Sequence, residues 1–139
     1  MKIAIAGIGY VGLSNAILLA QNNEVIAHDI SISKVKQINN RTFLINDAKV
    51  RNYLDNKNLN LKGTLDYKLA YKGAEFVIIS TPTDYDIKNN HFDTSTVERV
   101  IKDIVSVNTK STIIIKSTVP VGFTEQINKK FELNEIIFS

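Results

Sequence analysis

The stretch Gly7-Ile8-Gly9-Tyr10-Val11-Gly12 decides the fold of this chain. A short apolar run, residues 2–6, precedes it, and residues 13–20 follow it with the composition of a helix. A second apolar run, residues 24–28, ends on Asp29. This order of strand, glycine turn, helix, strand and acid is typical of a dinucleotide-binding fold.

Each glycine in the motif has its own expected role. Gly7 lets the chain turn sharply off the strand, Gly9 leaves room for a pyrophosphate because it has no Cβ, and Gly12 lets the helix pack tightly on the strand. The helix N-terminus adds N–H groups and a positive dipole end for the phosphates. Asp29 follows at about the expected spacing of 20 residues, where a carboxylate accepts hydrogen bonds from an adenosine ribose and repels a 2′-phosphate. The motif therefore predicts NAD rather than NADP as the cofactor.

The alternative interpretation is a glycine-rich turn that binds no ligand, with Asp29 as a helix N-cap. Glycines in many turns match the motif, so the motif alone is weak support. Here an apolar strand precedes it, an apolar-faced helix follows it, and the second strand ends in an acid. This context favours dinucleotide binding, and Asp29 can serve both roles.

Composition places the chain among ordinary globular domains. Its 139 residues fit one domain, and 44% of them are hydrophobic and 22% charged. The net charge of +3 comes with lysines spread along the chain, so we expect no nucleic-acid surface. The lack of cysteine excludes disulfides, a thiolate metal site and a thiol nucleophile within these residues. No stretch is long enough to span a membrane and the start does not read as a signal peptide, so we expect a cytoplasmic location.

Apolar periodicity predicts alternating helices and strands after Asp29. Helices are expected after a Ser31 cap, over 46–55, over 67–71, through 97–105 behind a capping box at 95–98, and over 123–131. Strands are expected at 61–65, 75–80, 111–115 and 135–138, and an exposed loop at 84–92. The predicted fold is therefore α/β, a Rossmann-type doubly wound, mostly parallel sheet with helices on both faces and strand order 3-2-1-4-5-6.

Candidate binding residues follow the carboxyl ends of four predicted strands. The glycine motif follows the first strand and Asp29 ends the second. Thr81-Pro82-Thr83 follow the fourth strand, and Ser117-Thr118 follow the fifth. Ligands of open α/β sheets bind at this edge, so the shared position supports a binding site more strongly than any single motif.

Longer stretches of the sequence resemble a known family. They are Ser80–Asp86 (STPTDYD), Phe92–Thr94 (FDT), Lys116–Thr124 (KSTVPVGFT) and Ile136–Ser139, together with the glycine motif, Asp29 and Lys34. The combination is similar to the N-terminal NAD-binding domain of the UDP-glucose 6-dehydrogenases, within the UDP-glucose/GDP-mannose dehydrogenase family. The resemblance covers essentially the whole chain.

The resemblance implies an NAD-dependent double oxidation of UDP-glucose to UDP-glucuronate, with two NAD reduced and a cysteine-bound thioester on the way. Carried over by position, Asp29 and Lys34 bind the adenosine ribose, and Thr118 lies by the nicotinamide and helps to position a water at the reacting carbon. Thr118 is thereby the catalytic candidate. The cofactor-binding residues so implied are Gly7, Gly9, Tyr10, Val11, Gly12, Asp29, Lys34, Thr81, Pro82, Thr83, Ser117 and Thr118.

Ordinary structural roles are the alternative for several of these residues. Thr83 and Thr118 are also common turn residues after buried strands. Lys34 by itself would be a solvated helix lysine. His28 and His91 are expected to be ordinary polar residues, and no metal-binding constellation is visible in the sequence.

The chain also departs from the family, whose members are much longer. The family's catalytic cysteine, lysine, asparagine and glutamate, its central helix and its UDP-sugar domain have no counterpart in residues 1–139. We expect residues 1–139 to be one NAD-binding Rossmann domain, an N-terminal fragment that is inactive alone because it has no thiol nucleophile. The resemblance implies a homodimer for the full-length enzyme and leaves the state of the fragment open. The alternatives are a dehydrogenase for UDP-N-acetylmannosamine or GDP-mannose, and a non-catalytic NAD-binding module.

Overall fold

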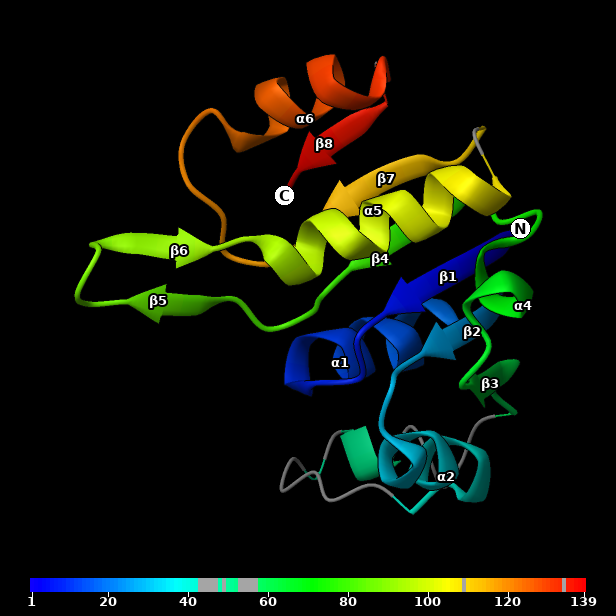
Figure 1. Cartoon of the computed structure of the whole chain (residues 1–139). Helices are drawn as coiled ribbons and strands as arrows, with labels where there is room; N and C mark the ends of the chain where they lie inside the picture. The colour runs from blue at the N-terminus through cyan, green and yellow to red at the C-terminus, as the bar shows by residue number, and fades with distance from the viewer. Residues whose placement is uncertain (43–47, 49, 53–57, 109, 134) are drawn as a thin grey trace.

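The computed structural model describes residues 1–42, 48, 50–52, 58–108, 110–133 and 135–139. The described chain is built around one six-stranded sheet (Figure 1). Its strands are β1 (Lys2–Ala6), β2 (Glu24–His28), β3 (Leu61–Thr64), β4 (Phe76–Ile79), β7 (Thr112–Ile115) and β8 (Ile136–Phe138). They pair in the order β3-β2-β1-β4-β7-β8, and every pairing is parallel. This order confirms the predicted doubly wound sheet.

Helices cover both faces of this sheet (Figure 1). They are α1 (Tyr10–Leu19), α2 (Ile32–Asn40), α4 (Tyr67–Tyr71), α5 (Ser95–Val107) and α6 (Phe123–Phe131). Side chains of β1 alternate between the faces, because Ile3 and Ile5 belong to the core under α1 and α2, whereas Ala4 and Ala6 belong to the core under α4, α5 and α6. No helix in the described part of the chain is long and apolar enough to cross a membrane.

Most predicted helices and strands match the structure to within one or two residues at their ends. The Ser31 cap of α2 is confirmed, since Ser31 Oγ accepts a hydrogen bond of 3.4 Å from Lys34 N. The helix predicted over 46–55 falls largely on residues outside the described ones.

The capping box predicted at residues 95–98 is wrong. Helix α5 begins at Ser95 itself, its N-cap residue is Thr94, and no side chain makes a cap hydrogen bond there. The side chain that serves this turn comes from one residue earlier, because Asp93 Oδ1 accepts a hydrogen bond of 3.0 Å from Ser95 N. The carboxylate of Asp93 therefore takes a main-chain donor at the helix start from outside the helix.

The segment predicted as an exposed loop over 84–92 is indeed mostly exposed, but it forms a β-hairpin and not a loop. Strands β5 (Asp84–Asp86) and β6 (His91–Asp93) pair antiparallel, and the hairpin projects past the arrowhead of β1 (Figure 1). The rings of Tyr85 and Phe92 meet edge to face across the pair, with centroids 5.0 Å apart. Asn90 supplies the left-handed turn with φ of 53°. An aromatic cross-strand pair and an asparagine turn thus order a polar segment.

Two asparagines close the two edges of the parallel sheet. At the β3 edge, Asn39 of α2 donates to Gly63 O at 3.0 Å and accepts from Gly63 N at 2.8 Å. At the β8 edge, Asn128 of α6 donates to Ile136 O at 3.1 Å and accepts from Ile136 N at 3.3 Å. Each carboxamide imitates a neighbouring strand, so main-chain groups that would otherwise invite another chain are paired within the domain.

Candidate cofactor-binding site

The first glycine of the motif turns the chain away from β1 under tight constraint. Gly7 has φ of 97°, a conformation that favours glycine. A Cβ built on Gly7 would lie 2.9 Å from the carbonyl group of Ser80 and from Thr81 N. The turn after β1 therefore packs directly against the segment that follows β4, which joins two of the predicted binding segments.

The other two glycines have opposite surroundings. A Cβ on Gly12 would lie 1.9 Å from Gly7 O, so the first turn of α1 packs against the end of β1 at a distance only glycine allows. A Cβ on Gly9 would meet no atom within 4 Å. Gly12 is thus required for packing inside the domain, whereas Gly9 faces open space where a ligand can approach the backbone. The packing role predicted for Gly12 is confirmed, and the pyrophosphate role of Gly9 stays a prediction.

The start of α1 offers main-chain donors next to that open space. Gly9 is the N-cap residue, it makes no side-chain cap hydrogen bond, and no acidic residue stands in the first turn. The first helical bond runs from Leu13 N to Gly9 O, at 2.9 Å. The N–H groups of Tyr10, Val11 and Gly12 precede that bond, so they are suited to an anion that a ligand brings.

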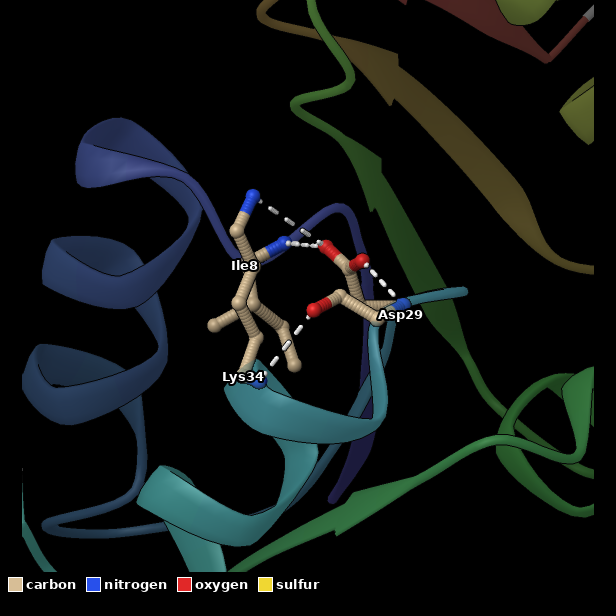
Figure 2. Close-up of polar contacts among 4 residues, drawn as sticks. Ile8, Asp29 and Lys34 are labelled. Atoms are coloured by element: carbon tan, nitrogen blue, oxygen red, sulfur yellow. Dashed lines mark hydrogen bonds and ion pairs between the residues drawn. The ribbon is translucent and has the colours of Figure 1, made fainter.

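Asp29 lies beside this turn with its carboxylate fixed by backbone donors, as Figure 2 shows. Asp29 Oδ2 accepts from Ile8 N at 2.8 Å, and Oδ1 accepts from Ser31 N at 2.9 Å. The side chain is 10% exposed. Since a carboxylate has about four acceptor positions, both oxygens keep capacity for further donors such as ribose hydroxyls. Asp29 is not the N-cap of α2, because Ser31 holds that position.

Lys34 stands at the rim of the same site. Its Nζ lies 3.9 Å from Asp29 Oδ2, and its side chain is 46% exposed (Figure 2). An exposed ion pair of this length contributes little to stability. Its effect is local, since it places a flexible cation at the edge of the Asp29 carboxylate from the first turn of α2.

The segments after β4 and β7 lie next to each other. Ser117 is buried, at 6% exposed, and its Oγ donates to Thr81 O at 2.6 Å. Thr118 and Pro82 are exposed, and Thr83 is half-buried. The hydroxyls of Ser80 and Thr81 are buried without a hydrogen-bond partner in the described structure. Unpaired buried hydroxyls are uncommon in proteins, and these two lie in the segment that contacts the glycine turn.

All predicted site residues follow the carboxyl ends of β1, β2, β4 and β7, which are consecutive in the sheet. Sequence reasoning missed one residue of this arrangement. Ile8 supplies the main-chain donor that orients Asp29, and a main-chain contact of this kind has no signature in residue type.

Three further polar side chains lie near the site without joining it. Tyr71 Oη is 3.3 Å from His28 Nδ1, on the α4 side of β2. Burial lowers the pKa of His28 and raises that of Tyr71. Lys116 has no carboxylate partner among the described residues and donates to Ser139 Oγ at 3.2 Å. The described residues contain no cluster of histidine, aspartate and glutamate placed to hold a metal ion.

A parallel sheet in this order, with an open glycine at a helix start and a fixed acid after the second strand, defines a Rossmann-type dinucleotide-binding domain. Comparison with known proteins narrows the class. The model of the UDP-glucose/GDP-mannose dehydrogenase family, NAD binding domain, matches residues 1–136. The chain belongs to this family.

Individual relatives agree with that assignment. The chain is 52% identical over 139 residues to a UDP-glucose 6-dehydrogenase of Streptococcus pneumoniae and 48% identical over 141 residues to one of Campylobacter jejuni. Each match covers all of this chain, which spans only 35% and 36% of the length of these relatives. A UDP-D-ManNAc dehydrogenase structure from Pyrococcus horikoshii superimposes with a TM-score of 0.82 at 28% identity, covering 99% of this chain and 35% of that one.

Proposed function

We propose that this chain is the NAD-binding part of a UDP-glucose 6-dehydrogenase, an enzyme that oxidises UDP-glucose to UDP-glucuronate while two NAD are reduced. The observation that carries the proposal is the fixed carboxylate of Asp29 beside the open backbone of Gly9. The first supplies acceptors for ribose hydroxyls and the second supplies space for a pyrophosphate. Both lie at the edge of the sheet where dinucleotides bind.

In this proposal the glycine motif and the residues that follow β2 bind the adenosine half of the cofactor. The N–H groups of Tyr10, Val11 and Gly12 face the pyrophosphate, and Gly7 shapes the turn that presents them. Asp29 accepts from the ribose hydroxyls, and Lys34 reaches the same sugar from the rim. Because two backbone donors hold Asp29 in place, its charge cannot move away from a 2′-phosphate, so the site selects NAD over NADP.

The segments after β4 and β7 bind the nicotinamide half of the cofactor in this proposal. Thr81, Pro82 and Thr83 would line this half, and Thr118, which is exposed, would lie beside the nicotinamide. Bound NAD supplies a hydride acceptor for the C6 carbon of the sugar. The hydroxyl of Thr118 both donates and accepts hydrogen bonds, which suits it to hold a water beside the reacting carbon.

The identity of the sugar rests on similarity. Sequence identity is 52% and 48% to UDP-glucose 6-dehydrogenases, against 30% to a UDP-N-acetyl-D-mannosamine dehydrogenase and 33% to a GDP-mannose 6-dehydrogenase, so UDP-glucose is favoured as the substrate. The aldehyde-to-acid step needs a thiol nucleophile, and these 139 residues contain no cysteine. We therefore expect this chain alone to bind NAD without oxidising UDP-glucose.

A second candidate function is a non-catalytic module that binds NAD, since the residues proposed to hold the cofactor all lie within this chain. The two candidates share the cofactor site and differ in whether a sugar-binding part with a thiol acts on the same NAD. Addition of UDP-glucose to the NAD-loaded chain alone does not distinguish the two candidates. They are distinguished when the chain is joined to such a sugar-binding part and turnover of UDP-glucose is assayed.

Calorimetric titration tests the proposed cofactor site. The chain is titrated with NAD and, separately, with NADP, and both titrations are repeated on Asp29→Ala. We expect NAD to bind more tightly than NADP and the substitution to remove most of that preference, because the carboxylate is its source. Equal affinity of the native chain for NAD and NADP, or binding of neither, would contradict the proposal.

A further inference from the structure

Ser117 joins two segments that the sequence separates widely. It follows β7 and is 6% exposed. Its Oγ donates to Thr81 O at 2.6 Å, and its backbone N donates to Ile79 O at 3.2 Å. The backbone of Ser117 therefore binds the last residue of β4, and its side chain binds the segment that follows β4, at the carboxyl edge of the sheet.

We infer that Ser117 is a positioning residue: its hydroxyl holds the segment Thr81–Thr83 in the orientation that meets the nicotinamide half of NAD. The inference rests on the proposed function. It replaces the expectation that Ser117 contacts the cofactor directly, because the hydroxyl is buried and its one proton is directed to main-chain carbonyls, with Thr81 O at 2.6 Å much nearer than Ile79 O at 3.4 Å.

The chemistry of the segment explains why one hydrogen bond can orient it. Thr81 precedes Pro82, whose ring fixes its own φ, disfavours the helical region for Thr81 and removes an N–H. The peptide unit that joins Thr81 to Pro82 is planar, so fixing the Thr81 carbonyl fixes the plane from which Pro82 and Thr83 continue. The Thr81 hydroxyl makes no hydrogen bond in the described structure, so the carbonyl is the anchored group of this residue.

The position of this contact in the sheet makes the inference specific to one half of the ligand. A dinucleotide lies across the two halves of a doubly wound sheet, with its adenosine on the side of the glycine motif and the acid. Asp29 and Gly9 belong to the β1 and β2 side, whereas Ser117 and Thr81 belong to the β4 and β7 side. Loss of the Ser117 hydroxyl is therefore expected to weaken contacts with the nicotinamide half more than contacts with the adenosine half.

The test compares two ligands on matched serine variants of the 139-residue chain. ADP carries the adenosine and the diphosphate but lacks the nicotinamide riboside, so it reports on the half that Ser117 does not reach. Ser111→Ala is the control, because Ser111 is also 6% exposed and also donates to a carbonyl, Asn108 O at 3.4 Å, at the opposite end of β7. Calorimetry gives the affinity for NAD and for ADP, and thermal unfolding monitors the fold.

We expect Ser117→Ala to weaken NAD binding by about three- to tenfold, the effect of one hydrogen bond, and to change ADP binding by less than about twofold. Ser111→Ala should leave both affinities unchanged. Ser117→Thr keeps the hydroxyl and should restore most of the NAD affinity. Ser117→Cys nearly keeps the volume of the side chain but weakens the donor, so it serves as a second variant without the hydroxyl and should behave as Ser117→Ala does.

Two results would overturn the inference while leaving the proposed function intact. One is native NAD affinity in both Ser117→Ala and Ser117→Cys. The other is an equal loss of NAD and ADP affinity, which would mean that Ser117 only stabilises the fold. Failure of the native chain to bind either ligand would instead contradict the proposed function, and with it this inference.

Discussion

Replacement of Gly9 by alanine should separate cofactor binding from folding. The added Cβ meets no atom within 4 Å, and Gly9 has φ of −82°, which alanine adopts without strain. The cost in folding is then limited to the poorer helix-capping of alanine, at most about 1 kcal/mol. The methyl group occupies the space in which the pyrophosphate approaches the backbone, so NAD affinity should fall by at least about tenfold.

Replacement of Gly12 by alanine gives the opposite prediction. Its Cβ would lie 1.9 Å from Gly7 O, whereas real Cβ contacts are essentially never shorter than 3.0 Å. Helix α1 would have to move away from β1 by more than about 1 Å, and closely packed interiors do not absorb such a shift. The expected loss of stability is about 1–3 kcal/mol or more.

Urea unfolding and calorimetric titration with NAD on both variants form the assay. We expect Gly9→Ala to keep nearly native stability and to lose affinity for NAD, and Gly12→Ala to lose stability. An alanine at position 9 that binds NAD as tightly as the native chain would refute the argument that the open space at Gly9 receives the pyrophosphate. A fully stable Gly12→Ala variant would refute the packing argument.

Three further predictions concern the scaffold. Burial lowers the pKa of His28, so below about pH 6.5 the unfolded chain binds protons more readily than the folded one. The free energy of unfolding should therefore fall as pH falls from 7.5 to 5.5, and it should fall less in His28→Gln. An equal fall in both proteins would exclude His28 as a source of this pH dependence. Asn39→Ala leaves Gly63 N and O unpaired at the edge of the sheet and should lower the free energy of unfolding in urea by about 1–3 kcal/mol. The control Asn40→Ala should have a negligible effect, and equal losses in the two variants would contradict the pairing of Asn39 with Gly63. Phe92→Ala removes the aromatic pair of the hairpin and should lower the free energy of unfolding by about 0.2–1 kcal/mol. It should also increase hydrogen exchange at residues 84–93, and unchanged exchange would show that the aromatic pair does not stabilise the hairpin.

The parallel sheet could be predicted because its signals are local and repeated. Each buried strand is a short apolar run, and each long helix carries an apolar face, so the spacing of apolar residues along the sequence identifies both. The hairpin at residues 84–93 has no such signal. Its order depends on a ring contact between Tyr85 and Phe92 and on a positive φ at Asn90, which arise only when the segment folds back on itself. The capping box failed for a related reason, since Asp93 lies before the helix that it serves.

The location of the candidate site could be predicted, but the hydrogen bonds within it could not. Residues that follow parallel strands must meet at one edge of the sheet, and the glycine motif marks that edge. The fixed orientation of Asp29 depends on Ile8 N, and the link between Ser117 and Thr81 joins residues far apart in sequence. Such contacts depend on the main chain and on tertiary proximity, which residue type and spacing do not encode.

The most direct test of the central claim is an NMR titration of the ¹⁵N-labelled chain with NAD. We expect amide signals to shift at residues 7–12, at Asp29 to Ile30, and at the segments after β4 and β7, which share the carboxyl edge of the sheet. Signals at the opposite edge, such as those of Lys110 and Glu75, should stay in place. Shifts centred on that opposite edge, or no shifts at saturating NAD, would contradict a cofactor site at the glycine turn.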